Sequence, residues 1–307
     1  MKKLVPLFLL PLFWSQSFAQ SHQVPTSDGE LLHITVKGNG IPCLYLHGGP
    51  GSGSWWMEKF MGEELEQHFT MIYLDQRGVA RSSGTENSNY SMERLVKDFE
   101  EIREFLGIEN WLTMGHSFGG LLQMGYALRY PESIRGMLMI NTALHMQECF
   151  ETSWCPKALE FSGKADELSL CTDTTSHFVD RWQQAVDLVK EENVFWKMGY
   201  AEEENMHIMN ATFGEIPNWN GNMGNIVMNL TDYHINFKPL TSNVQAPVLF
   251  FYGRSDWMIG PNHFEGLAFP NMVLWGSEVG HMPFMEGRED LMQAIRVFLE
   301  AQELANF

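Results

Sequence analysis

The sequence predicts an α/β fold in which helices cover both faces of a mostly parallel sheet and a helical lid is inserted into the chain. Short apolar runs typical of buried strands alternate with segments of helical periodicity toward both ends of the sequence. Between residues 143 and 240 this alternation stops, and Met, Trp, Asn and acidic residues become frequent. We therefore divide the chain into a first core part at 20–142, a helical lid insertion at 143–240 and a second core part at 241–307.

Short strands open the first core part. Residues 31–37 alternate in polarity, the glycine-containing turn 38–40 follows, and residues 41–46 form an apolar run. Two strands separated by so short a turn predict a β-hairpin. Another short strand is expected at residues 70–74.

A helix and two more strands complete this first part. Apolar side chains recur at helical spacing from Ser91 to Leu106. Strands are expected at residues 111–114 and 136–140, with a helical pattern that begins at Leu121 between them. Strands that alternate with helices in this way are typical of a parallel sheet.

The second core part repeats the same alternation. Strands are expected at residues 248–252 and 272–275, and an amphipathic helix is expected over residues 288–304. Within the insertion, residues 178–189 have a helical pattern and no strand is predicted.

The composition is that of a globular protein with a strong excess of acid. The chain has 307 residues, 44% of them hydrophobic, and a formal net charge of −18. This length allows one large core with an insertion. The negative charge repels phosphate backbones, so nucleic acid is not an expected partner.

The first 19 residues have the pattern of a signal peptide. Two lysines precede the apolar run 4–14, and small residues occupy positions 17 and 19. We predict cleavage near Ala19 and an exported protein, either periplasmic or secreted. No other run is long and apolar enough to predict a membrane span.

Four cysteines fit an oxidising compartment. Cys43 lies in an apolar strand and is expected to be a buried free thiol. Cys149, Cys155 and Cys171 lie close together in the sequence, and their spacing leaves open which two of them pair.

Residues 115–119 form a G-x-S-x-G motif between the predicted strand at 111–114 and the helical pattern that follows it. In this context the motif places a serine hydroxyl on a crowded turn, where the neighbouring residues have to be small. We therefore predict that Ser117 is a nucleophile.

A serine nucleophile needs a base, and the base needs a group that orients it. Asp256 follows the predicted strand at 248–252, and His281 follows the one at 272–275. The order Ser, Asp, His along the chain is the order that accompanies a G-x-S-x-G turn. The predicted catalytic residues are therefore Ser117, Asp256 and His281.

Attack by the serine leaves a negative charge on the carbonyl oxygen, which backbone amides can stabilise. One candidate donor is the amide of Phe118, directly after the nucleophile. The other is the amide of Gly49, within the glycine-rich loop 47–51.

Five motifs give the chain a resemblance to the α/β-hydrolase fold and, within it, to the proline iminopeptidase (prolyl aminopeptidase) family. They are HGGPG at 47–51, DQRG at 75–78, GHSFGG at 115–120, GRSD at 253–256 and GH at 280–281. The first two are fairly specific to that family, and the others are general to the fold. Residues 79–82, Val-Ala-Arg-Ser, lack a second glycine that the family carries. We expect Asp75 and Arg77 to form structural pairs beside the site.

The resemblance implies an aminopeptidase that releases N-terminal proline or a similar residue through an acyl-enzyme. Such an enzyme needs a carboxylate for the free amine, and Glu204 in the insertion matches the family's position, although a solvated helix face is the alternative. A second glutamate of the family has no clear counterpart. Candidates for the apolar pocket are Trp154, Phe195, Trp196 and Tyr200.

The sequence leaves other activities open. An esterase, thioesterase or amidase that acts on small acyl substrates would use the same three residues, and an inactive binding module would not need them. The partner is expected to be a small peptide or acyl compound. No metal and no organic cofactor is implied, and the sequence does not determine the oligomeric state.

Overall fold

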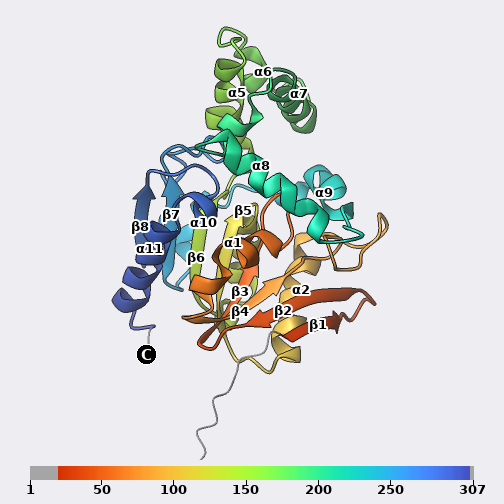
Figure 1. The fold of residues 1–307 in the computed structure, drawn as a ribbon, viewed down its shortest axis with the longest axis vertical. Coiled ribbons are helices and arrows are strands. Elements are labelled where there is room, and N and C mark those ends of the chain that lie inside the picture. Colours follow the sequence, from red (N-terminus) through yellow and green to blue (C-terminus); the bar gives the residue numbers. More distant parts are fainter. Residues whose placement is uncertain (1–19, 305–307) are drawn as a thin grey trace, which may run out of the picture.

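The computed structural model describes residues 20–304, and the predicted signal peptide at residues 1–19 lies outside them. An eight-stranded sheet in the order β1-β2-β4-β3-β5-β6-β7-β8 forms the centre of the molecule, and helices pack on it (Figure 1). Neighbouring strands from β4 through β8 in this order are parallel. At the other edge, β2 is antiparallel to both of its neighbours, β1 and β4. The predicted α/β fold is therefore confirmed.

The strands are β1 (Gln20–Pro25), β2 (Leu31–Lys37), β3 (Ile41–Leu46), β4 (Phe69–Leu74), β5 (Trp111–Ser117), β6 (Ile134–Thr142), β7 (Val248–Gly253) and β8 (Met272–Ser277). The core helices are α1 (Trp55–Leu65), α2 (Met92–Phe105), α3 (Gly119–Arg129), α10 (Pro283–Glu286) and α11 (Arg288–Ala301). Each strand predicted from the sequence is present, and α2 and α11 correspond to the two predicted amphipathic helices.

The predicted hairpin between β2 and β3 is wrong, because β4 lies between these two strands. Their connection passes against the backbone at the start of β4. A Cβ atom at Gly38 would overlap the carbonyl oxygen of Phe69, and one at Gly40 would overlap that of His68. The two glycines therefore allow the chain to cross β4 closely, whereas the sequence suggested that they form a hairpin turn.

Hydrophobic side chains fill both faces of the sheet. Along β3, Leu44 and Leu46 belong to the core that α2 and α3 cover. Cys43 and Tyr45 point the opposite way, into the core that α1 and α11 cover. This alternation is expected when helices cover a sheet on both sides.

The helical insertion lies between β6 and β7. Its helices are α4 (Met146–Cys149), α5 (Cys155–Phe161), α6 (Ser169–Thr172), α7 (Phe178–Glu191), α8 (Glu203–Ala211) and α9 (Asn222–Ile226), joined by short 3₁₀ and π segments. In Figure 1, α8 and α9 lie above the sheet and α5, α6 and α7 lie farthest from it. Within the described residues, no helix is both long and apolar enough to cross a membrane.

The structure identifies the cysteine pair that the sequence left open. Cys155 and Cys171 form a disulfide that joins α5 to α6. Cys43 and Cys149 are free and buried, so the prediction for Cys43 is confirmed.

Candidate active site

Ser117 ends β5 at a turn that only small neighbours permit. Its φ is +55°, a left-handed conformation that is costly for a residue with a side chain. A Cβ atom at Gly115 would overlap the Gln123 side chain, and one at Gly119 would overlap the carbonyl oxygen of Leu46. Both glycines of the G-x-S-x-G motif are therefore required for the chain to leave the strand and enter α3.

His281 and Asp256 form a buried hydrogen-bonded pair. Nδ1 of His281 lies 2.9 Å from Oδ2 of Asp256. The other carboxylate oxygen, Oδ1, accepts hydrogen bonds from the amides of Met258 and Ile259 at 3.0 and 3.1 Å. With Nδ1–H donating to the carboxylate, Nε2 of His281 is left as the basic nitrogen.

Three separate segments fix the backbone around His281. Its amide donates to the carbonyl oxygen of Gly199 at 2.8 Å, which connects it to the insertion. Nε2 of His116 donates to the carbonyl oxygen of His281 at 2.8 Å. Asn141, directly before the end of β6, donates to the carbonyl oxygen of Gly280 at 2.7 Å. The imidazole position is therefore set by the core and the insertion together.

Two other histidines near the site are held in their neutral form. Burial lowers the pKa of His47 to about 4 and that of His116 to about 3. The His116 ring lies 4.7 Å from that of His281, centroid to centroid. Because His116 is neutral, it adds no positive charge beside His281.

Ser117 and His281 border the same cavity, which has a volume of about 380 Å³. In the described part of the chain, no hydrogen bond connects the Ser117 hydroxyl with the His281 ring. Looser contacts between nucleophile and base are common before a substrate binds. The structure thus brings the three predicted catalytic residues to one place, with the Asp256–His281 contact already formed.

The two amides predicted to stabilise an oxyanion flank this serine. Phe118 is the residue that precedes α3, at the end of the helix where backbone N–H groups lack helical partners. Gly49 lies on the cavity wall with a φ of +111°. A side chain at Gly49 would overlap the amides of Gly51 and Ser52, so the loop conformation depends on this glycine.

Aromatic and aliphatic side chains form most of the cavity wall. Trp154, Phe195 and Tyr200 of the four predicted pocket aromatics line it. The prediction missed Tyr45, Trp56, Trp182, Phe213 and Phe284, which also line it. For Trp182 a signal was available, since Trp182, Val186 and Lys190 are spaced by four residues in the predicted helix and share one face.

Neither of the two predicted substrate-binding residues lies on this wall. Glu204 is exposed in the first turn of α8, and its neighbour Asn205 donates instead to Glu286 at 3.0 Å. Trp196 packs against the core beneath α1 and α11. Among the described residues that line the cavity there is no Asp or Glu, and Lys190 is the one lysine or arginine.

Asp75 and Arg77 have structural partners, as expected. Asp75 accepts from the Ser54 amide at 2.9 Å and pairs with Arg81 at 2.6 Å. The buried Arg77 pairs with Asp98 at 2.7 Å and with Asp28 at 2.8 Å. These pairs hold the segment after β4 beside the site.

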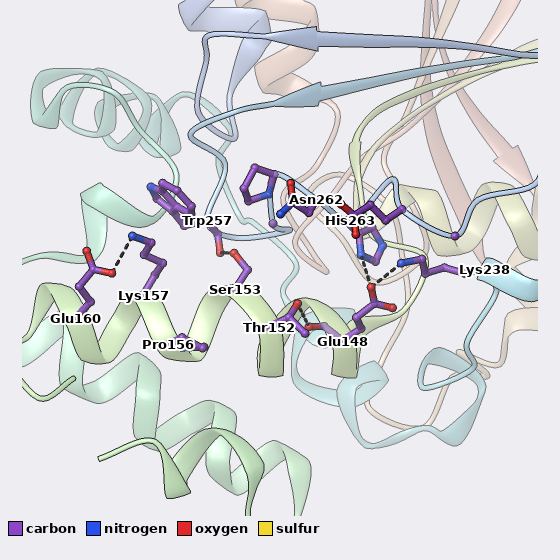
Figure 2. Close-up of a pocket in the computed structure, with 14 residues that line it drawn as sticks. Glu148, Thr152, Ser153, Pro156, Lys157, Glu160, Lys238, Trp257, Asn262 and His263 are labelled. Atoms are coloured by element: carbon purple, nitrogen blue, oxygen red, sulfur yellow. Dashed lines mark hydrogen bonds and ion pairs between the residues drawn. The ribbon is translucent and has the colours of Figure 1, made fainter. Parts of the chain in front are cut away.

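A larger groove, of about 640 Å³, lies between the helical run that begins at α4 and the loop after Asp256 (Figure 2). Four of its charged groups form two pairs. Glu148 lies 2.5 Å from Lys238, and Lys157 lies 2.8 Å from Glu160. Because Ser117 and His281 are not among its lining residues, we do not assign the chemistry to this groove.

The fold that carries this serine turn and histidine–aspartate pair is that of a known family. A family model described as alpha/beta hydrolase fold covers residues 42–288, and the chain belongs to this family. A proline iminopeptidase from Neisseria gonorrhoeae is 35% identical over 124 residues. That alignment covers 39% of this chain and 38% of the relative, so it spans well under half of either protein.

Solved structures of similar fold cover nearly the whole chain. A proline iminopeptidase-related protein from Thermus thermophilus has a TM-score of 0.76 at 19% identity, covering 93% of this chain and 98% of that one. An esterase from Rhodococcus has a TM-score of 0.68 at 19% identity, covering 92% and 99%. At these identities the likeness concerns the fold.

Proposed function

We propose that the protein is a serine hydrolase that cleaves a carboxylic ester or amide through an acyl-enzyme on Ser117. The observation that carries the proposal is the shared cavity: Ser117 on its strained turn, and His281 held by Asp256, border the same space. This is the geometry that activation of a serine hydroxyl requires.

The proposed reaction follows from these positions. Ser117 Oγ attacks the substrate carbonyl while Nε2 of His281 takes its proton, and Asp256 stabilises the imidazolium without taking the proton itself. The amides of Phe118 and Gly49 donate to the oxyanion, where one such donor is worth about 3 kcal/mol. His281 then protonates the leaving group, and water releases the acyl group by the same steps.

The cavity favours an ester or neutral amide over a peptide with a free N-terminus. The proline iminopeptidase relatives and the motifs at 47–51 and 75–78 support an aminopeptidase. However, a desolvated ammonium group requires a carboxylate partner, and the cavity wall offers a lysine and no Asp or Glu in the described chain. We therefore place the esterase or amidase alternative first and the aminopeptidase second.

Three substrates and one variant test this order. Wild-type protein is expected to hydrolyse 4-nitrophenyl butyrate and to show no preference for prolyl 4-nitroanilide over its N-acetylated form, because the cavity does not compensate the free amine. Ser117→Ala should fold normally, lose nearly all turnover and resist labelling by a fluorophosphonate probe. Substantial turnover by this variant would overturn the proposal. A strong preference for the prolyl anilide over its N-acetylated form would restore the aminopeptidase to first place.

We also propose that the mature protein is exported after cleavage near Ala19. The Cys155–Cys171 disulfide supports this, because such bonds persist in oxidising compartments. Mass spectrometry of the mature N-terminus tests it directly. An intact Met1 on protein isolated from cells would contradict it.

A further inference from the structure

One face of α7 supplies a wall of the cavity. Trp182, Val186 and Lys190 are spaced by four residues and all three line it. The adjoining face is buried among α5, α6 and the π segment, where Ala185 and Val189 are fully enclosed. The orientation of α7 is therefore fixed by packing, and Lys190 stands on the cavity side because of that packing.

Among the described residues, Lys190 is the one lysine or arginine on this wall, and none of the others forms an ion pair or side-chain hydrogen bond with it. Within the described chain it forms no ion pair and no hydrogen bond through its side chain, and its side chain is exposed. The protein as a whole has a formal net charge of −18. The described residues of the cavity wall include one lysine and no Asp or Glu. The charge of the wall is therefore opposite in sign to the net charge of the protein.

The ammonium group and several aromatic rings of the cavity wall come from the insertion, whereas the reacting groups come from the core. Ser117 and His281 lie at the core, whereas Trp154, Trp182 and Phe195 belong to the insertion that carries Lys190. A substrate that fills the cavity places an apolar part against these rings and its far end beside α7. A cavity of about 380 Å³ is large enough for such a molecule.

We propose that the natural substrate carries a carboxylate at the end remote from its scissile carbonyl, separated from it by an apolar spacer, and that Lys190 pairs with this carboxylate. The inference rests on the proposed function, since it names the substrate class for the same site. The ammonium group acts on substrate capture and selectivity, and Lys190 takes no part in the bond-breaking steps. Because the side chain is exposed, water and salt screen the pair and its effect is moderate.

Two matched pairs of esters test the proposal on both sides of the scissile bond. The acyl arm compares 4-nitrophenyl hydrogen adipate with 4-nitrophenyl hexanoate, and the leaving-group arm compares 3-carboxyphenyl acetate with its methyl ester. The readout in each arm is the ratio of kcat/KM for the charged ester to that for the neutral one, with the rate of Ser117→Ala subtracted as background.

We expect Lys190→Met to lower this ratio roughly fivefold in one arm, chiefly through KM. Lys190→Arg should keep the ratio, Lys190→Glu should lower it further, and 0.5 M NaCl should reduce the wild-type preference. Lys164→Met is the matched control, because it removes the same charge from the insertion at a residue that does not line the cavity. It should leave both ratios unchanged.

The outcomes separate the two proposals. If Lys190→Met keeps the wild-type ratio in both arms while Ser117-dependent turnover of neutral esters persists, the assignment of Lys190 is overturned and the serine hydrolase stands. If no ester shows turnover that depends on Ser117, the proposed function fails together with the substrate class.

Discussion

The parallel-sheet core and the helical insertion maintain their structures by different means. In the core, a Cβ atom at Gly115 would overlap the Gln123 side chain, and one at Gly119 would overlap the Leu46 backbone. In the insertion, a methyl group added at Gly163, Gly214 or Gly221 would have no atom within 4 Å. The insertion depends instead on side-chain clusters, one disulfide and short helices. The core therefore positions Ser117 on its turn, whereas the insertion supplies much of the cavity wall and, through the Gly199 carbonyl, one contact that holds His281.

Two connections attach the insertion to α1 beside the cavity mouth. The Trp56 indole N–H donates to the Thr212 hydroxyl at 2.9 Å, and Lys59 pairs with Glu215 at 2.6 Å. Phe213 lies between these two contacts in sequence, with its ring edge-on to Trp56 at 5.1 Å, and it also lines the cavity. The insertion is thus coupled to the core through side chains that border the substrate space.

The largest expected difference between the two regions comes from the same substitution made in each. Gly119→Ala should destabilise the protein by about 3 kcal/mol and abolish ester turnover, because its Cβ would overlap the Leu46 backbone below Ser117. Gly214→Ala should change the free energy of unfolding by about 0.5 kcal/mol or less, since a methyl group there meets no atom. Urea denaturation and nitrophenyl butyrate turnover measure both effects. Equal effects of the two substitutions would contradict the contrast.

The same contrast explains how much the sequence could predict. The strands, α2 and α11 follow from periodicity, and the order of Ser117, Asp256 and His281 follows from the motifs of the core. The position of β4 between β2 and β3 could not be predicted. Glycines at 38–40 that permit close backbone approach have the same sequence pattern as glycines in a hairpin turn.

The insertion was predictable as helical and its cavity wall only in part, since Trp154, Phe195 and Tyr200 line the cavity as predicted. Apart from α7 its helices are short, so in most of the insertion local periodicity does not determine which face meets the core. Glu204 matched a family position yet is exposed, and Trp196 packs against the core, while Trp182 lines the cavity. Which aromatic residue reaches the substrate space depends on tertiary packing that single-sequence patterns do not contain.

The disulfide should stabilise the insertion and leave the core nearly unaffected. Cys155 and Cys171 are 16 residues apart, and closing a loop of that size contributes about 2–3 kcal/mol. Replacing both by serine should therefore increase amide hydrogen exchange in α5, α6 and α7 while β3, β5 and β6 stay protected. Ester KM should rise, because Trp154 and Trp182 on the cavity wall belong to this region.

Reductant provides the control for this prediction. Dithiothreitol should reproduce the faster exchange in wild-type protein and add nothing to the double serine variant. Faster exchange in the central strands of the variant would mean that the stability of the core depends on the insertion, and would contradict this prediction.

The most gradual expected effect is a loss of core stability in mild acid. Burial lowers the pKa values of His47 and His263 to about 4 and that of His116 to about 3, against about 6.5 in an unfolded chain. The unfolded state therefore binds more protons as the pH falls below 6.5. The stabilisation is complete above that pH and is lost as the pH falls toward 4, by about 1.4 kcal/mol per pH unit for each histidine.

Urea denaturation at pH 7.5, 6.5 and 5.5 measures this slope. His263→Gln should reduce it by the share of one histidine. The glutamine side-chain oxygen can take the place of Nε2, which now accepts from the Leu144 amide at 2.9 Å, but it does not titrate. The groove in which His263 lies belongs partly to the insertion, whereas His47 and His116 lie in the core. A free energy of unfolding that does not change between pH 6.5 and 5.5 would show that these imidazoles are hydrated, and that the core is less tightly closed around Ser117 than its contacts indicate.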